Sequence, residues 1–310
     1  MSEYHTPVLL KESVDALISA PNGTYVDATF GGGGHSKEIL SRLGPDATLL
    51  AFDRDSDALA NKIDDPRLVL IHNNFRFVHN YALVEAHKAT RDFHGCAVDG
   101  ILADLGVSSH QFDTAERGFS FRYDSPLDMR MNAEAPVSAA TIIATYPQED
   151  LERILRIYGE VDNSRRMAAL IVAAREKSPI ETTTQLDEAI KSCLPPYAEH
   201  KVLAKVYQAL RIEVNQEMRS LEKFLDGAAR SLRPGGRLVV ITYHSLEDRM
   251  VKNFIKTGNI GGDEQKDFYG RTKAPLRAVN RKPILPEENE ISANTRARSA
   301  KLRIAEKVEE

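Results

Sequence analysis

The most informative stretch of the chain is TYVDATFGGGGHS, which occupies residues 24–36. A short apolar run ends there in four successive glycines, and a segment of helical character follows at 36–43. Backbone without side chains can pass close to a ligand beside the amino terminus of a helix, where unpaired amide groups point outward. We therefore expect a strand, a ligand-binding turn and a helix in that order. A flexible turn that binds nothing is the alternative.

The rest of the chain extends this pattern on both sides of an interruption. Apolar runs at 48–53, 68–71 and 100–105 alternate with helical segments, as in a parallel sheet with crossover helices. No strand pattern occurs between about 112 and 204, where residues 139–157, 164–176 and 182–193 each predict a helix. Beyond it the sequence predicts a helix at 202–227, a turn at 233–236, strands at 237–243 and 299–305, and a loop at 258–294.

The expected architecture is therefore an α/β, Rossmann-like domain with a mostly parallel sheet, interrupted by a smaller all-helical insertion. We expect the domain to comprise residues 1–112 and 205–310, and the insertion to comprise residues 113–204.

Composition excludes several classes of protein. The 310 residues are 42% hydrophobic and 28% charged, with a net charge of −4, as in ordinary globular proteins. No apolar stretch reaches the roughly 18 residues of a membrane span, and the amino terminus resembles neither a signal nor a transit peptide. Two cysteines, Cys96 and Cys193, cannot form a disulfide framework or a structural zinc site, and HEXXH and CxxC patterns are absent. We expect a cytoplasmic protein with no membrane partner and no metal.

The glycine cluster also bears on the choice of cofactor. In the NAD fingerprint G-x-G-x-x-G the third glycine would fall on Ser36 or Lys37, which counts against the alternative of an NAD-dependent dehydrogenase. An acidic residue before the glycines suits S-adenosylmethionine, which has no pyrophosphate.

Asp53 closes the second apolar run, where an acid can accept hydrogen bonds from both ribose hydroxyls; a helix N-cap is its alternative role. Phe75 lies beyond the third run and either packs against an adenine or belongs to the core.

Two polar loops follow the later strands of the predicted sheet. DLGVSSHQ at 104–111 ends the fourth run, and HSLEDR at 244–249 follows the fifth. Ligands bind outside the carboxyl ends of parallel strands, so both loops are expected to face the crevice of the glycines. Asp104 and His244 are the candidate acid–base groups, although a lone histidine is more often structural. A serine hydrolase is excluded, because no G-x-S-x-G elbow occurs.

Cations gather in two further regions. RGFSFRY at 117–123 and PLDMRM at 126–131 interleave arginines with aromatic residues and methionines, which suits base stacking and phosphate contact; a packed loop is the alternative. Residues 271–303 hold nine Lys and Arg against three Glu, a surplus of six, which suits a phosphate backbone or simply a solvated face.

Eight segments then occur in order along nearly the whole chain: HTPVLL (5–10), FGGGGHS (30–36), DLGVSS (104–109), RGFSF (117–121), PLDMRM (126–131), QALRIEVN (208–215), HSLEDR (244–249) and RARSAKL (296–302). Together they resemble the RsmH (MraW) family of bacterial 16S rRNA cytosine-N4 methyltransferases. The resemblance implies a class I methyltransferase fold with a helical insertion, and S-adenosylmethionine as methyl donor. It also implies methylation of the cytosine at position 1402 of 16S rRNA, in the decoding centre of the small ribosomal subunit.

The resemblance also implies individual site residues. The cofactor contacts carried over from the family are Gly33, Gly34, His35, Asp53, Phe75, Asp104 and Gln111. We expect the RNA contacts at Arg117, Arg122, Arg130, Arg296 and Arg298. The chain departs from the family pattern at His110 (usually Pro), Phe112 (usually Leu) and Tyr243 (usually Phe).

The implied chemistry needs alignment and a proton acceptor. The N4 amine of cytosine is a poor nucleophile because its lone pair is delocalised into the ring, so catalysis depends on in-line geometry and on a group that draws off one N4 proton. Asp104 and His244 are the candidates. Methylation of another RNA or of a small molecule is the alternative, and a non-catalytic RNA-binding factor is a third hypothesis. A homodimer is compatible with the sequence.

Overall fold

The structure, a computed structural model, describes residues 7–89, 98–266, 268–270 and 273–309. The sequence-based interpretations of His5, Thr6, Cys96 and Arg271 fall outside these residues. The chain divides into two compact units, one formed by Met1–Gly106 with Met218–Glu310 and the other by Val107–Glu217.

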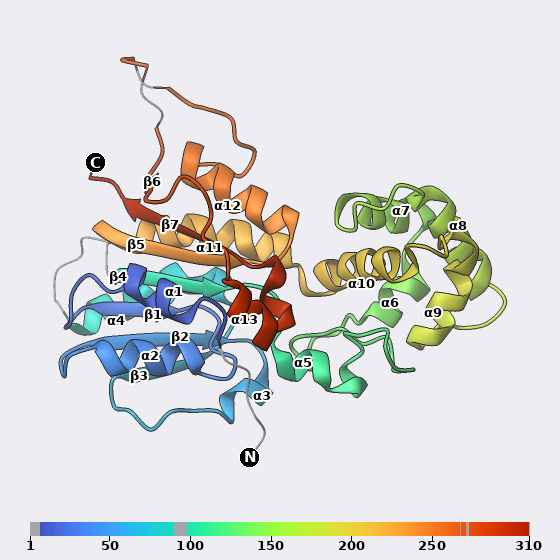
Figure 1. The fold of residues 1–310 in the computed structure, drawn as a ribbon, viewed down its shortest axis with the longest axis horizontal. Helices are drawn as coiled ribbons and strands as arrows, with labels where there is room; N and C mark the ends of the chain where they lie inside the picture. Colours follow the sequence, from blue (N-terminus) through green and yellow to red (C-terminus); the bar gives the residue numbers. More distant parts are fainter. Residues whose placement is uncertain (1–6, 90–97, 267, 271–272, 310) are drawn as a thin grey trace. The chain divides into compact units, whose positions relative to one another are not determined.

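The first unit contains the predicted sheet (Figure 1). Its described strands are β1 Thr24–Asp27, β2 Thr48–Asp53, β3 Leu68–His72, β4 Val98–Asp104, β5 Leu232–Thr242, β6 Leu276–Ala278 and β7 Lys301–Lys307. They form one sheet in the order β3-β2-β1-β4-β5-β7-β6. The pairs from β3 to β5 are parallel, whereas β7 is antiparallel to both β5 and β6. The strand order reverses between β1 and β4, and ligands bind at such a switch point, outside the carboxyl ends of the strands.

Helices cover both faces of this sheet. They are α1 Leu10–Leu17, α2 Gly34–Arg42, α3 Ser56–Leu59, α4 Val78–Ala89, α11 Glu217–Ser231, α12 Ser245–Thr257 and α13 Glu288–Ala293, with 3-10 turns η1 Phe75–Phe77 and η4 Thr295–Ser299. Tyr25 and Leu49 share one apolar cluster with residues of α1 and α2. Their neighbours Val26 and Leu50 share the other with residues of α4, α11 and α12. Burial on both faces explains why these strands are continuous apolar runs in the sequence.

The second unit is helical and has its own core. Its elements are α5 Ser109–Asp113, α6 Ala139–Thr145, α7 Gln148–Ile157, α8 Ser164–Arg175, α9 Thr183–Ile190 and α10 Glu199–Asn215, with 3-10 turns η2 Ala115–Arg117 and η3 Lys191–Cys193. The backbone of this unit is described throughout and forms no strand, apart from an isolated bridge between Pro126 and Thr182. Met129, Ile142 and Ile154 are fully buried in its apolar cluster. No helix in the described ranges of the chain has both the length and the apolar character needed to cross a bilayer.

Several elements differ from their sequence-based predictions. The single helix expected at 139–157 is divided into α6 and α7 at Tyr146, which is extended because the residue before a proline is disfavoured in the helical region. The helix expected at 202–227 is α10 and α11, separated by Gln216 at φ 49°. The turn at 233–236 bulges out within β5, and the loop at 258–294 contains β6 and α13.

The limits of the helical unit also differ from the expected 113 and 204. Val107 already packs against the helical core, so the unit begins before α5. The whole of α10 packs against α6 and α7, which moves the far limit to Glu217. Apolar spacing in the sequence shows that a helix buries one face, but it does not identify the core that the face contacts.

Candidate active site

Four glycines connect β1 to α2 at the carboxyl edge of the sheet. Gly31 and Gly33 have φ of +52° and +74°, in the left-handed region that favours glycine, and Gly33 is the N-cap of α2. A Cβ at Gly34 would collide with Pro7, so this position also requires glycine. A Cβ at Gly31 would meet only the Thr29 carbonyl oxygen, at 4.0 Å, which leaves open space over the loop.

The buried carboxylate of Asp27 holds the two ends of this glycine loop together. Its Oδ2 accepts a hydrogen bond of 2.6 Å from the Ser36 hydroxyl, in the first turn of α2. Its Oδ1 accepts one of 3.1 Å from the amide of Thr29. Burial raises the pKa of Asp27. Sequence analysis counted Asp27 only as the acidic residue before the glycines that suits S-adenosylmethionine, and the structure makes it the support of the loop.

Asp53, at the end of β2, accepts two backbone hydrogen bonds. Its Oδ2 accepts from the amide of Gly31 and its Oδ1 from the amide of Asp55, each at 2.8 Å. Burial raises the pKa of Asp53. The N-cap of α3 is Asp55, which accepts a hydrogen bond from the amide of Asp57, so the N-cap role considered for Asp53 is wrong. Each Asp53 oxygen retains acceptor capacity for a ligand.

Asp104, at the end of β4, is surrounded by polar groups. Its Oδ1 accepts a hydrogen bond of 2.7 Å from the Tyr243 hydroxyl, and its Oδ2 lies 3.8 Å from Nδ1 of His35. Its own amide donates to the Thr29 hydroxyl at 2.7 Å. Burial raises the pKa of Asp104 to about 6, against the opposing effects of His35 and the Tyr243 hydrogen bond. The carboxyl group is therefore close to half ionised near pH 6.

His244 caps a helix. Its Nδ1 accepts from the Glu247 amide at 3.4 Å, at the start of α12, and Oε2 of the same glutamate accepts from the amide of Tyr243 at 2.9 Å. Nε2 of His244 lies 3.1 Å from Glu247 Oε1, but this buried nitrogen makes no hydrogen bond with the described residues. The side chain is only 8% exposed. The structure thus gives His244 the structural role that sequence reasoning weighed against catalysis.

Phe75 follows β3 in η1. Its ring meets that of Phe224 edge-to-face, with centroids 5.2 Å apart, and it is half-buried against the apolar cluster on that face of the sheet. Phe75 therefore contributes to the core, as one of its two interpretations expected.

Of the predicted cofactor contacts, those in the first unit gather at its sheet edge, on the loops that follow β1, β2, β3 and β4. Gln111 belongs to the second unit, where it forms a capping box with Ser108: the Gln111 Oε1 accepts from the Ser108 amide at 3.1 Å, and the Ser108 hydroxyl accepts from the Gln111 amide at 3.2 Å.

Comparison with known proteins identifies the family. Residues 2–308 match the MraW methylase family. The chain belongs to this family. It is 57% identical to ribosomal RNA small subunit methyltransferase H of Bacteroides fragilis strain YCH46, over 98% of the chain and 97% of the relative. It is 54% identical to the protein of that name from Flavobacterium johnsoniae, over 99% and 98%. A solved rRNA methylase from Streptococcus thermophilus aligns with 97% of the chain and 94% of its own, at 13% identity and a TM-score of 0.37.

Family membership confirms the class I methyltransferase fold and S-adenosylmethionine as the cofactor, in place of the NAD alternative. The residues at the sheet edge fit this group. Asp53 is fixed by two backbone amides and retains acceptor capacity, which suits a ribose diol, and the space over Gly31 leaves room for a ligand beside it.

Two of the arginines predicted to contact RNA, Arg117 and Arg130, make hydrogen bonds within the second unit. Arg117 donates from Nη2 to the carbonyl oxygens of Arg130 and Met131, at 3.0 Å each. Arg130 donates to both carboxylate oxygens of Asp128, at 2.8 and 2.7 Å, and to the Ala135 carbonyl at 2.7 Å. This is the packed loop that was the alternative interpretation.

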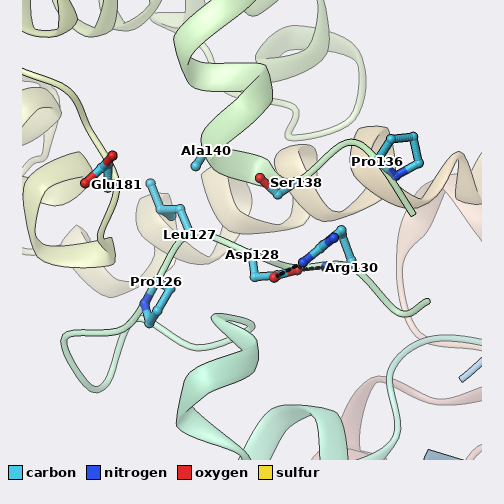
Figure 2. A pocket seen from close by; sticks show the side chains of 8 residues that line it. All are labelled: Pro126, Leu127, Asp128, Arg130, Pro136, Ser138, Ala140 and Glu181. Atoms are coloured by element: carbon cyan, nitrogen blue, oxygen red, sulfur yellow. Dashed lines mark hydrogen bonds and ion pairs between the residues drawn. The ribbon is translucent and has the colours of Figure 1, made fainter. Parts of the chain in front are cut away.

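The paired side chains of Asp128 and Arg130 also line an open pocket of about 210 Å³ in this unit (Figure 2). Its lining residues are Pro126, Leu127, Asp128, Arg130, Pro136, Ser138, Ala140 and Glu181.

The remaining cations divide into paired and exposed groups. Within the cation-rich residues 271–303, Arg303 and Lys301 both pair with Asp248, at 2.6 and 3.4 Å, and Arg277 pairs with Glu306 at 2.6 Å. These ion pairs reduce the surplus of positive charge that the sequence suggested. Arg296 is half-buried in η4. By contrast, Arg122 and Arg298 are exposed, and neither guanidinium has a partner within the described part of the chain.

Sequence reasoning missed two groups around the site: the Thr29 hydroxyl and the Tyr243 hydroxyl. Thr29 lies inside the quoted glycine segment, where the glycines and the acid before them drew attention. Tyr243 was noted as a departure from the family pattern, and this departure was the available signal.

Proposed function

We propose that this protein methylates the N4 amine of cytosine 1402 in 16S rRNA of the small ribosomal subunit, in the cytoplasm, with S-adenosylmethionine as donor. The observation that carries the proposal is the meeting of Asp53, the glycine loop and Asp104 at one sheet edge, in a member of the MraW methylase family. The names of the curated relatives support the small-subunit substrate. The base and its position follow from the motif resemblance.

The cofactor would be held by the sheet-edge residues. Asp53 accepts hydrogen bonds from the two ribose hydroxyls, since both its oxygens are fixed by backbone amides and retain acceptor capacity. Gly33 and Gly34 keep the loop free of side chains, and His35 follows them in α2. Phe75, in η1 after β3, and Gln111 remain expected contacts carried over from the motif resemblance. When bound, S-adenosylmethionine supplies a methyl group activated by its positively charged sulfur.

Asp104 is the proposed acceptor of the amine proton. As the new carbon–nitrogen bond forms, the N4 nitrogen releases one proton, and a carboxylate near its own pKa at working pH accepts it well. Tyr243 occupies Oδ1, so Oδ2 is the oxygen that takes the proton and later passes it to solvent. His244 is a less suitable acceptor, because its Nδ1 is already used as a helix cap. It remains a residue to test beside Asp104.

Arg122 and Arg298 are the proposed phosphate contacts among the five predicted arginines. Both are exposed and have no partner in the described residues, so they can pair with phosphate without breaking an internal contact. Arg117 and Arg130 would act indirectly, by fixing the shape of the loop between them.

The decisive experiment measures methyl transfer from labelled S-adenosylmethionine to small subunits isolated from a strain that lacks this gene. Mass spectrometry of the digested rRNA should find N4-methylcytidine at one position. Asp104→Asn should abolish most single-turnover transfer at saturating cofactor, and its affinity for S-adenosylhomocysteine is measured as well, because Asp104 is also an expected cofactor contact. His244→Asn keeps a good N-cap residue and should retain most activity. Absence of transfer by a wild-type protein that binds the cofactor would reject the proposed substrate.

A further inference from the structure

Tyr243 lies directly after β5 and has an unusual environment for a half-buried tyrosine. Its hydroxyl donates to Asp104 at 2.7 Å, and the described residues offer it no other hydrogen-bond partner. Gly106 passes over its ring with φ +105°, and a Cβ there would lie 3.2 Å from the ring. The ring is therefore positioned by close backbone packing, and the hydroxyl is directed at one carboxylate oxygen.

Resting on the proposed function, we infer that Tyr243 is a positioning residue that holds the Asp104 carboxylate ionised and oriented for accepting the amine proton. A hydroxyl stabilises a carboxylate by donating a hydrogen bond to it, and a phenylalanine at this position has no hydroxyl to donate. The bond fixes Oδ1 and thereby fixes the direction of Oδ2, the oxygen that remains for substrate.

Among the described residues, Tyr243 makes the side-chain hydrogen bond to the Asp104 carboxylate, whereas His35 favours the ionised form through its charge, the larger of the two effects on the Asp104 pKa. His35 on α2 lies 3.8 Å from Oδ2, beyond hydrogen-bond distance, and its Nε2 lies 3.3 Å from the Val8 carbonyl. Asp27 on β1 and Glu247 on α12 are acidic and act against ionisation of Asp104. The Tyr243 hydroxyl stays neutral, because burial, Asp104 and, to a smaller extent, Glu247 and Glu290 raise its pKa well above the ordinary value. It is thus a donor across the working pH range.

The experiment compares wild-type protein with Tyr243→Phe, a substitution that removes one oxygen atom and retains the ring. Single-turnover methylation of small subunits is measured from pH 5 to pH 9, at saturating cofactor. In the variant, the acidic limb of the profile should move up by about one pH unit. The rate should then fall about fivefold at pH 6 and match the wild type near pH 8.5.

Tyr25→Phe is the matched control. Tyr25 is a buried tyrosine of β1 whose hydroxyl accepts from the amides of Ser19 and Ala20, before the strand begins. Loss of this hydroxyl should lower the free energy of unfolding and leave the pH profile of the methylation rate unchanged. If the rate in Tyr243→Phe falls by the same factor at every pH and the acidic limb does not move, the inference is overturned. Tyr243 would then have only a structural role.

A second measurement separates this inference from the proposed function. Carboxyl carbons of ¹³C-labelled aspartate are titrated by NMR, and the Asp104 signal is assigned from its absence in Asp104→Asn. The Asp104 pKa should be about one unit higher in Tyr243→Phe than in the wild type. An equal pKa in both proteins overturns the inference even where transfer occurs. A shifted pKa in a protein that transfers no methyl group to RNA rejects the proposed function instead, and with it the catalytic use of the bond.

Discussion

The Oδ2 atom of Asp53 accepts a hydrogen bond of 2.8 Å from the amide of Gly31, so the end of β2 and the glycine loop after β1 are joined through one carboxylate. The carboxylate is thereby fixed before any ligand arrives. Such preorganisation reduces the entropy cost of binding, because the group need not be ordered by the ligand.

Asp53→Asn should therefore weaken cofactor binding. The amide retains the shape of the side chain, but its nitrogen cannot accept a hydrogen bond, so either a ribose hydroxyl or a backbone amide loses its partner. We expect a loss of roughly 10–100-fold in affinity for S-adenosylhomocysteine, measured by calorimetry. Asp55→Asn is the control, because asparagine remains a good N-cap for α3. Equal affinities for wild type and Asp53→Asn would remove Asp53 from the cofactor site.

The Asp104 carboxyl group should make stability depend on pH. Its folded-state pKa of about 6 lies above its unfolded value of about 3.9. The folded protein then binds the proton more tightly, so stability contributed by this group falls as pH rises from about 4 to about 6. The loss is on the order of 3 kcal/mol.

Asp104→Asn cannot ionise and should escape this loss. We expect the variant to be more stable than the wild type at pH 8 and to lose the advantage at pH 4.5, as measured by urea denaturation at both values. A variant that is less stable than the wild type at pH 8 would contradict the destabilising effect of the buried charge.

Asn215 should be a major stabilising residue of the second unit. Its amide donates to the Met129 carbonyl at 2.7 Å and its oxygen accepts from the Met131 amide at 2.8 Å. Met129 itself is fully buried at φ 58°, a conformation that needs support from its surroundings. Asn215→Ala should cost on the order of 2 kcal/mol, because buried backbone groups lose their partners.

Hydrogen exchange of residues 139–215, followed by mass spectrometry, measures this loss locally. Asn132→Ala is the control near Met129 and Met131, because the Asn132 side chain accepts an exposed hydrogen bond from the Glu134 amide and makes no buried one among the described residues. Similar protection in the wild type and Asn215→Ala would show that packing alone holds Met129 in place.

The exposed and the internally paired arginines should behave differently. Arg122→Ala and Arg298→Ala should weaken binding to rRNA and reduce its dependence on salt by about one counterion each, with little change in stability. Arg303→Ala should instead lower stability, because it leaves the half-buried Asp248 with one ion pair fewer. Filter binding at several salt concentrations and thermal unfolding measure the two effects. An unchanged salt slope in Arg122→Ala and Arg298→Ala would place the RNA elsewhere.

The sequence predicted the sheet well because its strands are buried on both faces and therefore appear as continuous apolar runs. The edge strand β6 was not predicted, because only Leu276 of its three residues is buried and no apolar run marks it. Pro147 could have predicted the break between α6 and α7 at Tyr146, but the helical spacing of apolar residues on both sides favoured one continuous helix.

The candidate site was predictable only where chemistry follows from local pattern. Glycines and acids at strand ends identify the cofactor edge of the sheet. The hydrogen bond between Tyr243 and Asp104 joins residues 139 positions apart, so no local sequence pattern can predict it. The arginines show another limit of local pattern, because composition does not reveal that Arg130 is hydrogen-bonded within its own loop while Arg122 is exposed without such a partner among the described residues.

The place of β7 in the sheet has a consequence for synthesis of the chain. Residues 301–307 are synthesised after the other described strands of the sheet, yet they lie between β5 and β6. The helical unit, 107–217, is continuous in the sequence and can assemble while translation proceeds. The sheet that contains Asp53 and Asp104 cannot be completed until β7 has been synthesised. A truncated product that ends before residue 301 would therefore expose the edges of β5 and β6, and would be recognised as unfinished by proteases and chaperones.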